Sequence, residues 1–106
     1  MSRSQTITTS PDWLPIPHAG EMLLSEFMEP LELGTSALAA AIAIEPARLQ
    51  ALIDGDARID GELDLRLTRY LRLSEGFFLR LQTSADLRSA KRALNGELER
   101  ITPRAA

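Results

Sequence analysis

The side chains that could perform catalysis in this 106-residue chain are few. The sequence has one histidine, His18, and no cysteine, so it offers neither a thiolate metal site nor a nucleophile–base pair built on these residues. Carboxylates are more numerous, but their places on amphipathic segments are typical of solvated helix faces, as at Glu26, Glu29, Glu32, Asp54 and Asp56. No Gly-rich phosphate loop is present. We therefore predict that the protein is not an enzyme and has no catalytic residue, metal site or cofactor.

Residues 33–53 have the pattern of a different kind of site, two short helices joined by a tight turn. The expected inward positions are aliphatic or small: Leu38, Ala39, Leu49, Leu52 and Ile53. A small residue at Ala39 permits close approach of the two helices, and Ile44 fills the corner between them. The second helix would then be free to enter a DNA major groove. The pattern predicts a helix-turn-helix.

The charges are unevenly distributed along the chain. The net charge is −3, but residues 20–65 carry ten acidic and two basic side chains, and residues 66–106 carry four acidic and nine basic ones. Two interpretations stay open at this point. The charges are solvated helix faces, or the basic half meets a negatively charged partner or the acidic half of another subunit.

Helical periodicity and capping residues predict the elements that must position this pair. Helices are expected at 20–29, at 35–43, and from Pro46 to a left-handed close at Gly55. Asp60 is the expected N-cap of a fourth helix and Ser74 of a fifth. An amphipathic tail follows at 86–101, weakened at Gly96.

The predicted inner faces of these elements are made of leucine and aromatic residues. The expected positions are Leu23, Leu24, Phe27, Met28, Leu31, Leu63, Leu67, Tyr70, Leu71, Phe77, Phe78 and Leu81. Ala and Leu are strong helix formers, and β-branched residues are too few for a sheet. We predict an all-α, compact bundle of five to six helices.

The N-terminal residues 1–17 are rich in Ser, Thr and Pro, which predicts a flexible arm whose apolar residues are Trp13 and Leu14. The chain start lacks the apolar core of a signal peptide. The longest apolar run, 37–44, is far short of the roughly 20 residues that span a bilayer. We expect a cytoplasmic protein with no membrane association.

Residues 18–87, about two-thirds of the chain, resemble the HigA-type antitoxins of the Xre/Cro-like helix-turn-helix superfamily. The matching motifs follow the family order: His18-Ala19-Gly20-Glu21, Phe27-Met28-Glu29-Pro30-Leu31-Glu32-Leu33, Ala37-Leu38-Ala39, Pro46 with Arg48, Ile53-Asp54-Gly55, Leu65-Arg66-Leu67 with Arg69-Tyr70, Phe77-Phe78-Leu79, Leu81-Gln82 and Asp86-Leu87. The resemblance implies a lambda-repressor-like DNA-binding domain at 18–87. Residues 88–106 would form a C-terminal helix or tail available for dimerisation.

The resemblance also implies function and partners. HigA-type antitoxins are typically dimers that bind a palindromic operator of double-stranded DNA in their own promoter, and they neutralise a HigB-type ribonuclease toxin. Carried over by position, Thr35 and Ser36 would contact the phosphate backbone. Ala47, Arg48 and Gln50 would lie in or beside the major groove, and Arg58 would approach phosphates.

A two-fold dimer interface is expected from the C-terminal part of the chain. Palindrome recognition requires this symmetry, and the expected interface residues are Phe78, Leu87, Leu94 and Leu98. Packing of the tail on its own domain is the alternative interpretation of the same apolar positions.

An alternative function is a degenerate helix-turn-helix that serves as a protein–protein interaction module with little DNA binding. The chain departs from the family where DNA would be met, at Gly34, Thr35, Ala43 and Asp56. The predicted outward face of the third helix is Ala47, Gln50, Ala51 and Asp54, with Arg48 at its flank. Arg66 is expected either to pair with a carboxylate or to contact DNA.

Overall fold

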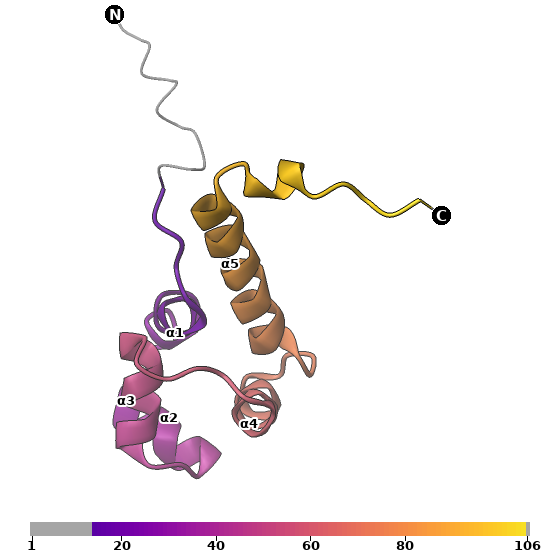
Figure 1. The fold of residues 1–106 in the computed structure, drawn as a ribbon. Helices are drawn as coiled ribbons and strands as arrows, with labels where there is room; N and C mark the ends of the chain where they lie inside the picture. The colour runs from indigo at the N-terminus through magenta and orange to yellow at the C-terminus, as the bar shows by residue number, and fades with distance from the viewer. Residues whose placement is uncertain (1–13, 106) are drawn as a thin grey trace, which may run out of the picture.

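The computed structural model describes residues 14–105, and this part of the chain is helical with no strand. The elements, in chain order, are α1 (Ala19–Leu23), the π-helix η3 (Leu24–Met28), α2 (Thr35–Ile42), α3 (Pro46–Asp54), α4 (Gly61–Leu71), α5 (Phe77–Leu94) and the 3₁₀ turn η4 (Glu97–Arg100) (Figure 1). The all-α prediction is confirmed. The expected flexibility of the arm, including Trp13, concerns residues that lie largely outside the described ones.

The core is aliphatic, with a small aromatic cluster at one end. The apolar side chains exposed by no more than 8% come from all five α-helices, from η3 and from the loop before α4: Ala19, Leu23, Met28, Leu38, Ala39, Ile42, Leu49, Leu52, Ile53, Ile59, Leu63, Leu67 and Phe78. Phe27, Phe77 and Phe78 pack edge to face, with ring centroids 5.1 to 5.7 Å apart. Around this core, α1 packs against α3 and α5, α2 packs against α3 and α4, and α4 packs against α5.

Two residues predicted to face inward are instead exposed. Leu31 is 59% exposed because η3 ends before it, and Glu32 in the following turn has a positive φ of 52°. Tyr70 is 46% exposed because it lies beside the C-terminal end of α2. The alanines there, Ala41 and Ala43, are too small to cover its ring.

The first helical segment begins with a capping box supplied by the single histidine. Nδ1 of His18 accepts a hydrogen bond from the Glu21 N–H (3.2 Å), and the His18 N–H donates to Oε1 of Glu21 (3.0 Å). The helix continues into η3 as a π-helix, in which the Glu29 N–H donates to the Leu24 carbonyl five residues back (2.9 Å). His18 therefore has a structural role.

The start of α5 is capped by another helix and not by the expected Ser74. Gly76 is the N-cap, with φ 88°, and it makes no side-chain cap of its own. Asp64, buried in α4, accepts hydrogen bonds from the N–H groups of Gly76 (2.6 Å), Phe78 (2.9 Å) and Leu79 (3.1 Å). The cap comes from tertiary structure, which a local sequence signal could not reveal.

Helix α5 extends beyond the other four helices, and the C-terminal segment leaves its end at a steep angle (Figure 1). It runs unbroken through residues 87 and 88, where the expected domain boundary lies. Asn95 and Gly96 both adopt left-handed conformations and end it, as the weak point at Gly96 predicted.

Candidate nucleic-acid interface

Helices α2 and α3 form a steeply bent pair. Their axes differ in direction by 119°, a geometry typical of a helix-turn-helix. Along residues 14–105 no single helix is long and apolar enough to cross a membrane. Helices α2 and α3 reach the required length and apolar composition only when they are taken together as one bent segment. The predicted pair is confirmed in its element bounds and its inner residues.

The turn between α2 and α3 depends on Ala43 and Ile44. Ala43 has φ 61° and ψ 48°, a left-handed conformation that costs a residue with a Cβ about 1 kcal/mol. The Ile44 N–H donates to the Ala39 carbonyl (3.0 Å), and the Ile44 side chain is half-buried at the corner. Ala43 therefore holds a position at which glycine would adopt the left-handed conformation without this cost.

The outward face of α3 is small and polar. Ala47, Gln50 and Asp54 are exposed, and Arg48 lies at the flank, half-buried. Ala51, predicted on the outward face, is partly covered. A surface of this kind can approach the floor of a major groove closely, and Gln50 and Asp54 are side chains on it that can hydrogen-bond to base edges.

Thr35, at the start of α2, and Gln50 are brought together across the bend. The Thr35 hydroxyl donates to Oε1 of Gln50 (3.3 Å), and Nε2 of Gln50 donates to Oδ1 of Asp54 (2.9 Å). Gly34 is the N-cap of α2 and supplies no side-chain cap, so the first N–H groups of this helix have no capping side chain. Ser36, beside Thr35, is exposed.

Arg48 is held at the flank of α3 by the start of the next helix. Its Nη2 lies 3.4 Å from Oδ2 of Asp60. The other carboxylate oxygen of Asp60 accepts the N-cap hydrogen bond from Leu63 (2.8 Å), which confirms the predicted cap of α4. One aspartate thus caps α4 and restrains the arginine of α3.

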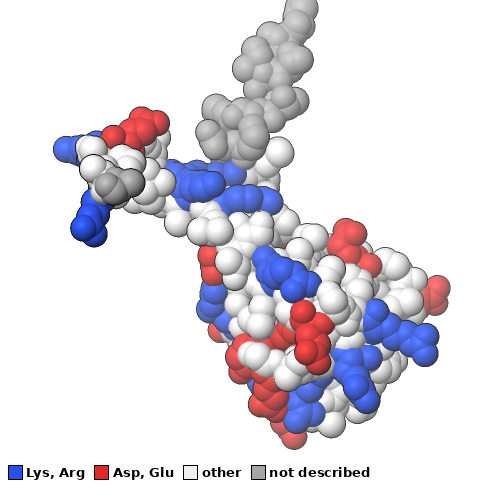
Figure 2. Space-filling model, turned by 90° about the vertical axis from the view of Figure 1, so that its right-hand side faces the viewer, with Lys and Arg blue, Asp and Glu red and all other residues white. Residues whose placement is uncertain are grey.

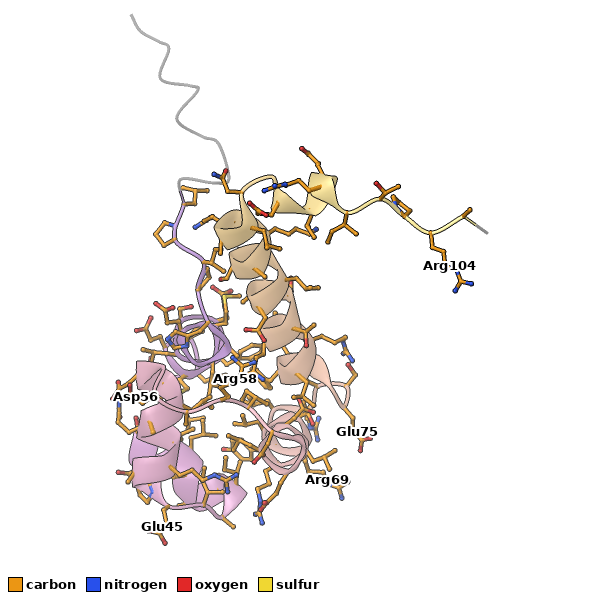
Figure 3. The ribbon with its side chains drawn as sticks, viewed as in Figure 1. Glu45, Asp56, Arg58, Arg69, Glu75 and Arg104 are labelled. Atoms are coloured by element: carbon orange, nitrogen blue, oxygen red, sulfur yellow. The ribbon has the colours of Figure 1, made fainter. Side chains whose placement is uncertain are left out.

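Arg58 is turned toward α5 (Figure 3). Its guanidinium makes two hydrogen bonds to the Asp86 carboxylate, of 3.2 and 2.5 Å. This hydrogen bonding, together with the charge of Arg58, lowers the pKa of Asp86, although partial desolvation opposes the shift. The same hydrogen bonding and the charge of Asp86 raise the pKa of Arg58.

A second contact fastens the same loop to α5. Gln82 accepts from the Ile59 N–H (2.8 Å) and donates to the Ile59 carbonyl (3.0 Å). With the pair of Arg58 and Asp86, this fixes the segment between α3 and α4 against α5. Sequence reasoning assigned no role to Gln82 or Asp86, although both lie within motifs matched by position.

The arginines on α4 and at its C-cap divide into one that is paired and two that are not. Arg66 pairs with Glu62 (3.0 Å) and donates to the Ile42 carbonyl (2.9 Å), so of the two expectations the carboxylate pair is observed. Arg69 and Arg72 have no ion pair within the described part of the chain. Arg69 lies on the side of α4 away from α3 (Figure 3). On the wide lower part of the face in Figure 2, basic and acidic side chains are interspersed, whereas basic side chains lie together on the narrower part above it.

The expected dimer residues differ in accessibility. Phe78 is fully buried in the core among Phe27 and Phe77, so it cannot present its side chain to a second subunit, and this expectation is corrected. Leu87, Leu94 and Leu98 are 57%, 38% and 48% exposed. Among residues 14–105 no group of three or more His, Asp or Glu side chains could hold a metal ion.

Comparison with known proteins gives relatives in sequence and in structure. No family model matches the chain. It is 33% identical over 78 residues to virulence-associated protein I of Dichelobacter nodosus, covering 74% of this chain and 72% of that protein. The Pseudomonas aeruginosa antitoxin HigA, solved with the higBA promoter, aligns over 86% of this chain and 100% of its own, with 27% identity and a TM-score of 0.75. The protein PA4674 of P. aeruginosa, solved with its 18-bp operator DNA, aligns over 87% of this chain and 98% of its own, with 28% identity and a TM-score of 0.79.

Proposed function

The chain belongs to the HigA-type antitoxins of the Xre-like helix-turn-helix superfamily, and we propose that it is a sequence-specific DNA-binding repressor of its own promoter. Its relatives are antitoxins and transcriptional regulators, which are not enzymes. For this role the protein would be in the cytoplasm, together with its operator.

The observation that carries this proposal is the bent pair of α2 and α3, which leaves the outward face of α3 uncovered. Structures of two similar proteins contain promoter or operator DNA. In this chain Ala47 and Gln50 would enter the major groove, with Arg48 beside it. Thr35 and Ser36, with the uncapped N–H groups of α2, would meet a phosphate.

Membership of this family supports two further proposed partners, a second copy of the chain and a toxin. The protein would form a homodimer, so that two copies of α3 read the halves of a palindromic operator. The exposed leucines of α5 and the C-terminal segment, Leu87, Leu94 and Leu98, support an interface there. The second partner is a HigB-like ribonuclease toxin, which the protein would neutralise by direct binding.

A specific observation favours a second candidate function, a protein-interaction module with little DNA binding. Both basic residues near α3, Arg48 and Arg58, are already paired with carboxylates. The outer face of α2 is formed by small apolar residues, Ala37, Ala40 and Ala41, which are exposed. Phosphate contacts supply most non-specific DNA affinity, and this surface is poor in free cations.

Titration of DNA from upstream of the gene, followed by fluorescence anisotropy at low and near-physiological salt, separates the two functions. An unrelated duplex tests specificity. We expect preferred binding of the upstream DNA and a loss of about 1–3 kcal/mol in Arg48→Ala. Arg104→Ala removes the same charge from the C-terminal segment, away from α3 (Figure 3), and should bind as the wild type does. Equal binding of both duplexes at low salt would favour the interaction module.

A further inference from the structure

Few basic side chains lie near α3, the helix proposed to enter the major groove, and each of the two is already paired with a carboxylate. Between residues 20 and 65 the sequence has two basic side chains, Arg48 and Arg58. Arg48 is paired with Asp60 at the start of α4, and Arg58 with Asp86 on α5. A DNA phosphate that approaches either guanidinium therefore competes with a carboxylate that is already in place.

We propose that Asp60 and Asp86 set the DNA affinity of this protein by holding Arg48 and Arg58 away from phosphates. This inference rests on the proposed function, because it concerns the affinity of the same DNA-binding surface. The guanidinium forks match phosphate as well as carboxylate geometry, so the two acceptors are direct competitors. DNA binding exchanges one partner for the other, and the free carboxylate remains beside the phosphate as a repelling charge.

The two pairs differ in strength, which predicts an order of effects. Arg58 and Asp86 share two hydrogen bonds, whereas Arg48 and Asp60 share one contact of 3.4 Å. The shifted pKa values of Arg58 and Asp86 are consistent with the closer coupling of that pair. All four side chains are substantially exposed, so solvent weakens both ion pairs and each arginine can still exchange its carboxylate for a phosphate. Removal of the Asp86 carboxylate should therefore have the larger effect.

The substitutions that test this inference are chosen to preserve the fold. Asp86→Asn removes the charge from an exposed side chain. Asp60→Asn removes the charge but keeps an oxygen that can cap α4, since Asn and Asp are about equal as N-caps. Glu26→Gln is the matched control, because Glu26 is exposed and has no ion pair within residues 14–105. Thermal melts by circular dichroism establish that each variant is folded.

The experiment measures operator affinity of the full chain by anisotropy across a range of salt concentrations. We expect Asp86→Asn to bind about three- to fivefold more tightly than the wild type, and Asp60→Asn by a smaller factor. The slope of log affinity against log salt should steepen by about 0.9 for each additional phosphate that the freed arginine neutralises. Glu26→Gln should change neither quantity appreciably.

A double-mutant cycle tests whether Asp86 changes the DNA affinity through Arg58. Asp86→Asn in an Arg58→Ala background should have no effect, because the competed cation is absent. The same increase in affinity in both backgrounds would mean that Asp86 acts by general repulsion, and the proposal would be overturned. Weaker binding by Asp86→Asn would also overturn it, since the pair would then order the loop for DNA.

The same titrations separate this inference from the proposed function. If the wild type prefers its operator and Asp86→Asn binds it with the same affinity, the proposed repressor function stands and the proposed competition between carboxylate and phosphate fails. If the wild type does not bind but the double variant Asp60→Asn with Asp86→Asn does, the competition stands and the repressor role of the wild type fails. If neither protein binds, both fail.

Discussion

Among single residues, Asp64 shows how one carboxylate can join two helices, α4 and α5. It is 1% exposed, and it accepts three backbone N–H groups at the start of α5. These donors have no intrahelical acceptor, because they belong to the first turn. The carboxylate thus does from α4 what an N-cap side chain ordinarily does from the adjoining residue.

Asp64→Ala should destabilise the protein by about 3 kcal/mol, because the N–H groups of Gly76, Phe78 and Leu79 would lose their acceptor in a largely buried site. Urea unfolding followed by circular dichroism measures the change. Asp54→Ala is the control: Asp54 is exposed on α3, and its loss should cost no more than about 0.5 kcal/mol. Equal unfolding midpoints for the two variants would refute the capping role.

At the scale of elements, the position of α3 depends on a close approach by α1. A Cβ added at Gly20 would lie 1.9 Å from the Leu52 carbonyl oxygen. No side chain can be accommodated there without movement of the α3 backbone. Because α3 carries the candidate DNA contacts, the glycine of α1 helps to position the recognition surface.

Gly20→Ala should lower the free energy of unfolding by about 2–3 kcal/mol, the cost of overpacking a rigid contact. Thermal melts compare it with Gly61→Ala. An added Cβ at Gly61 meets no atom within 4 Å, so that variant should be neutral or slightly stabilised. A Gly20→Ala protein as stable as wild type would show that α1 and α3 can separate freely.

At the scale of the whole molecule, three exposed leucines lie on α5 and on the segment after it, and this part of the chain extends beyond the other helices (Figure 1). Leu87 and Leu94 belong to α5, and Leu98 to η4. The proposed homodimer would cover them. A single copy of α3 reads only half of a palindrome, so dimerisation and operator affinity should be lost together.

The double substitution Leu87→Glu with Leu94→Glu should produce a monomer, because carboxylates would be desolvated in the interface. Light scattering at micromolar concentration reports the mass. Operator affinity should fall by about a hundredfold as two-site binding is lost. Leu31→Glu, at an exposed leucine outside α5, should stay dimeric. A monomeric wild type at this concentration would exclude the proposed dimer.

Features that depend on near neighbours in the chain could be predicted from the amino-acid sequence alone. Helical periodicity, the N-cap at Asp60 and the left-handed close at Gly55 act over one turn, so their signals are local. Together with the family motifs, they were enough to predict an all-α chain and the pair α2 and α3.

Which distant groups meet depends instead on how the helices pack. Arg58 and Asp86 are 28 positions apart, and their pairing depends on where α5 lies. The buried cap Asp64, the exposed Tyr70 and the buried Phe78 depend likewise on which neighbour covers a helix face. Periodicity states that a face is apolar, but packing alone determines what lies against it, because side chains distant in sequence compete for the same space and the same hydrogen-bond partners.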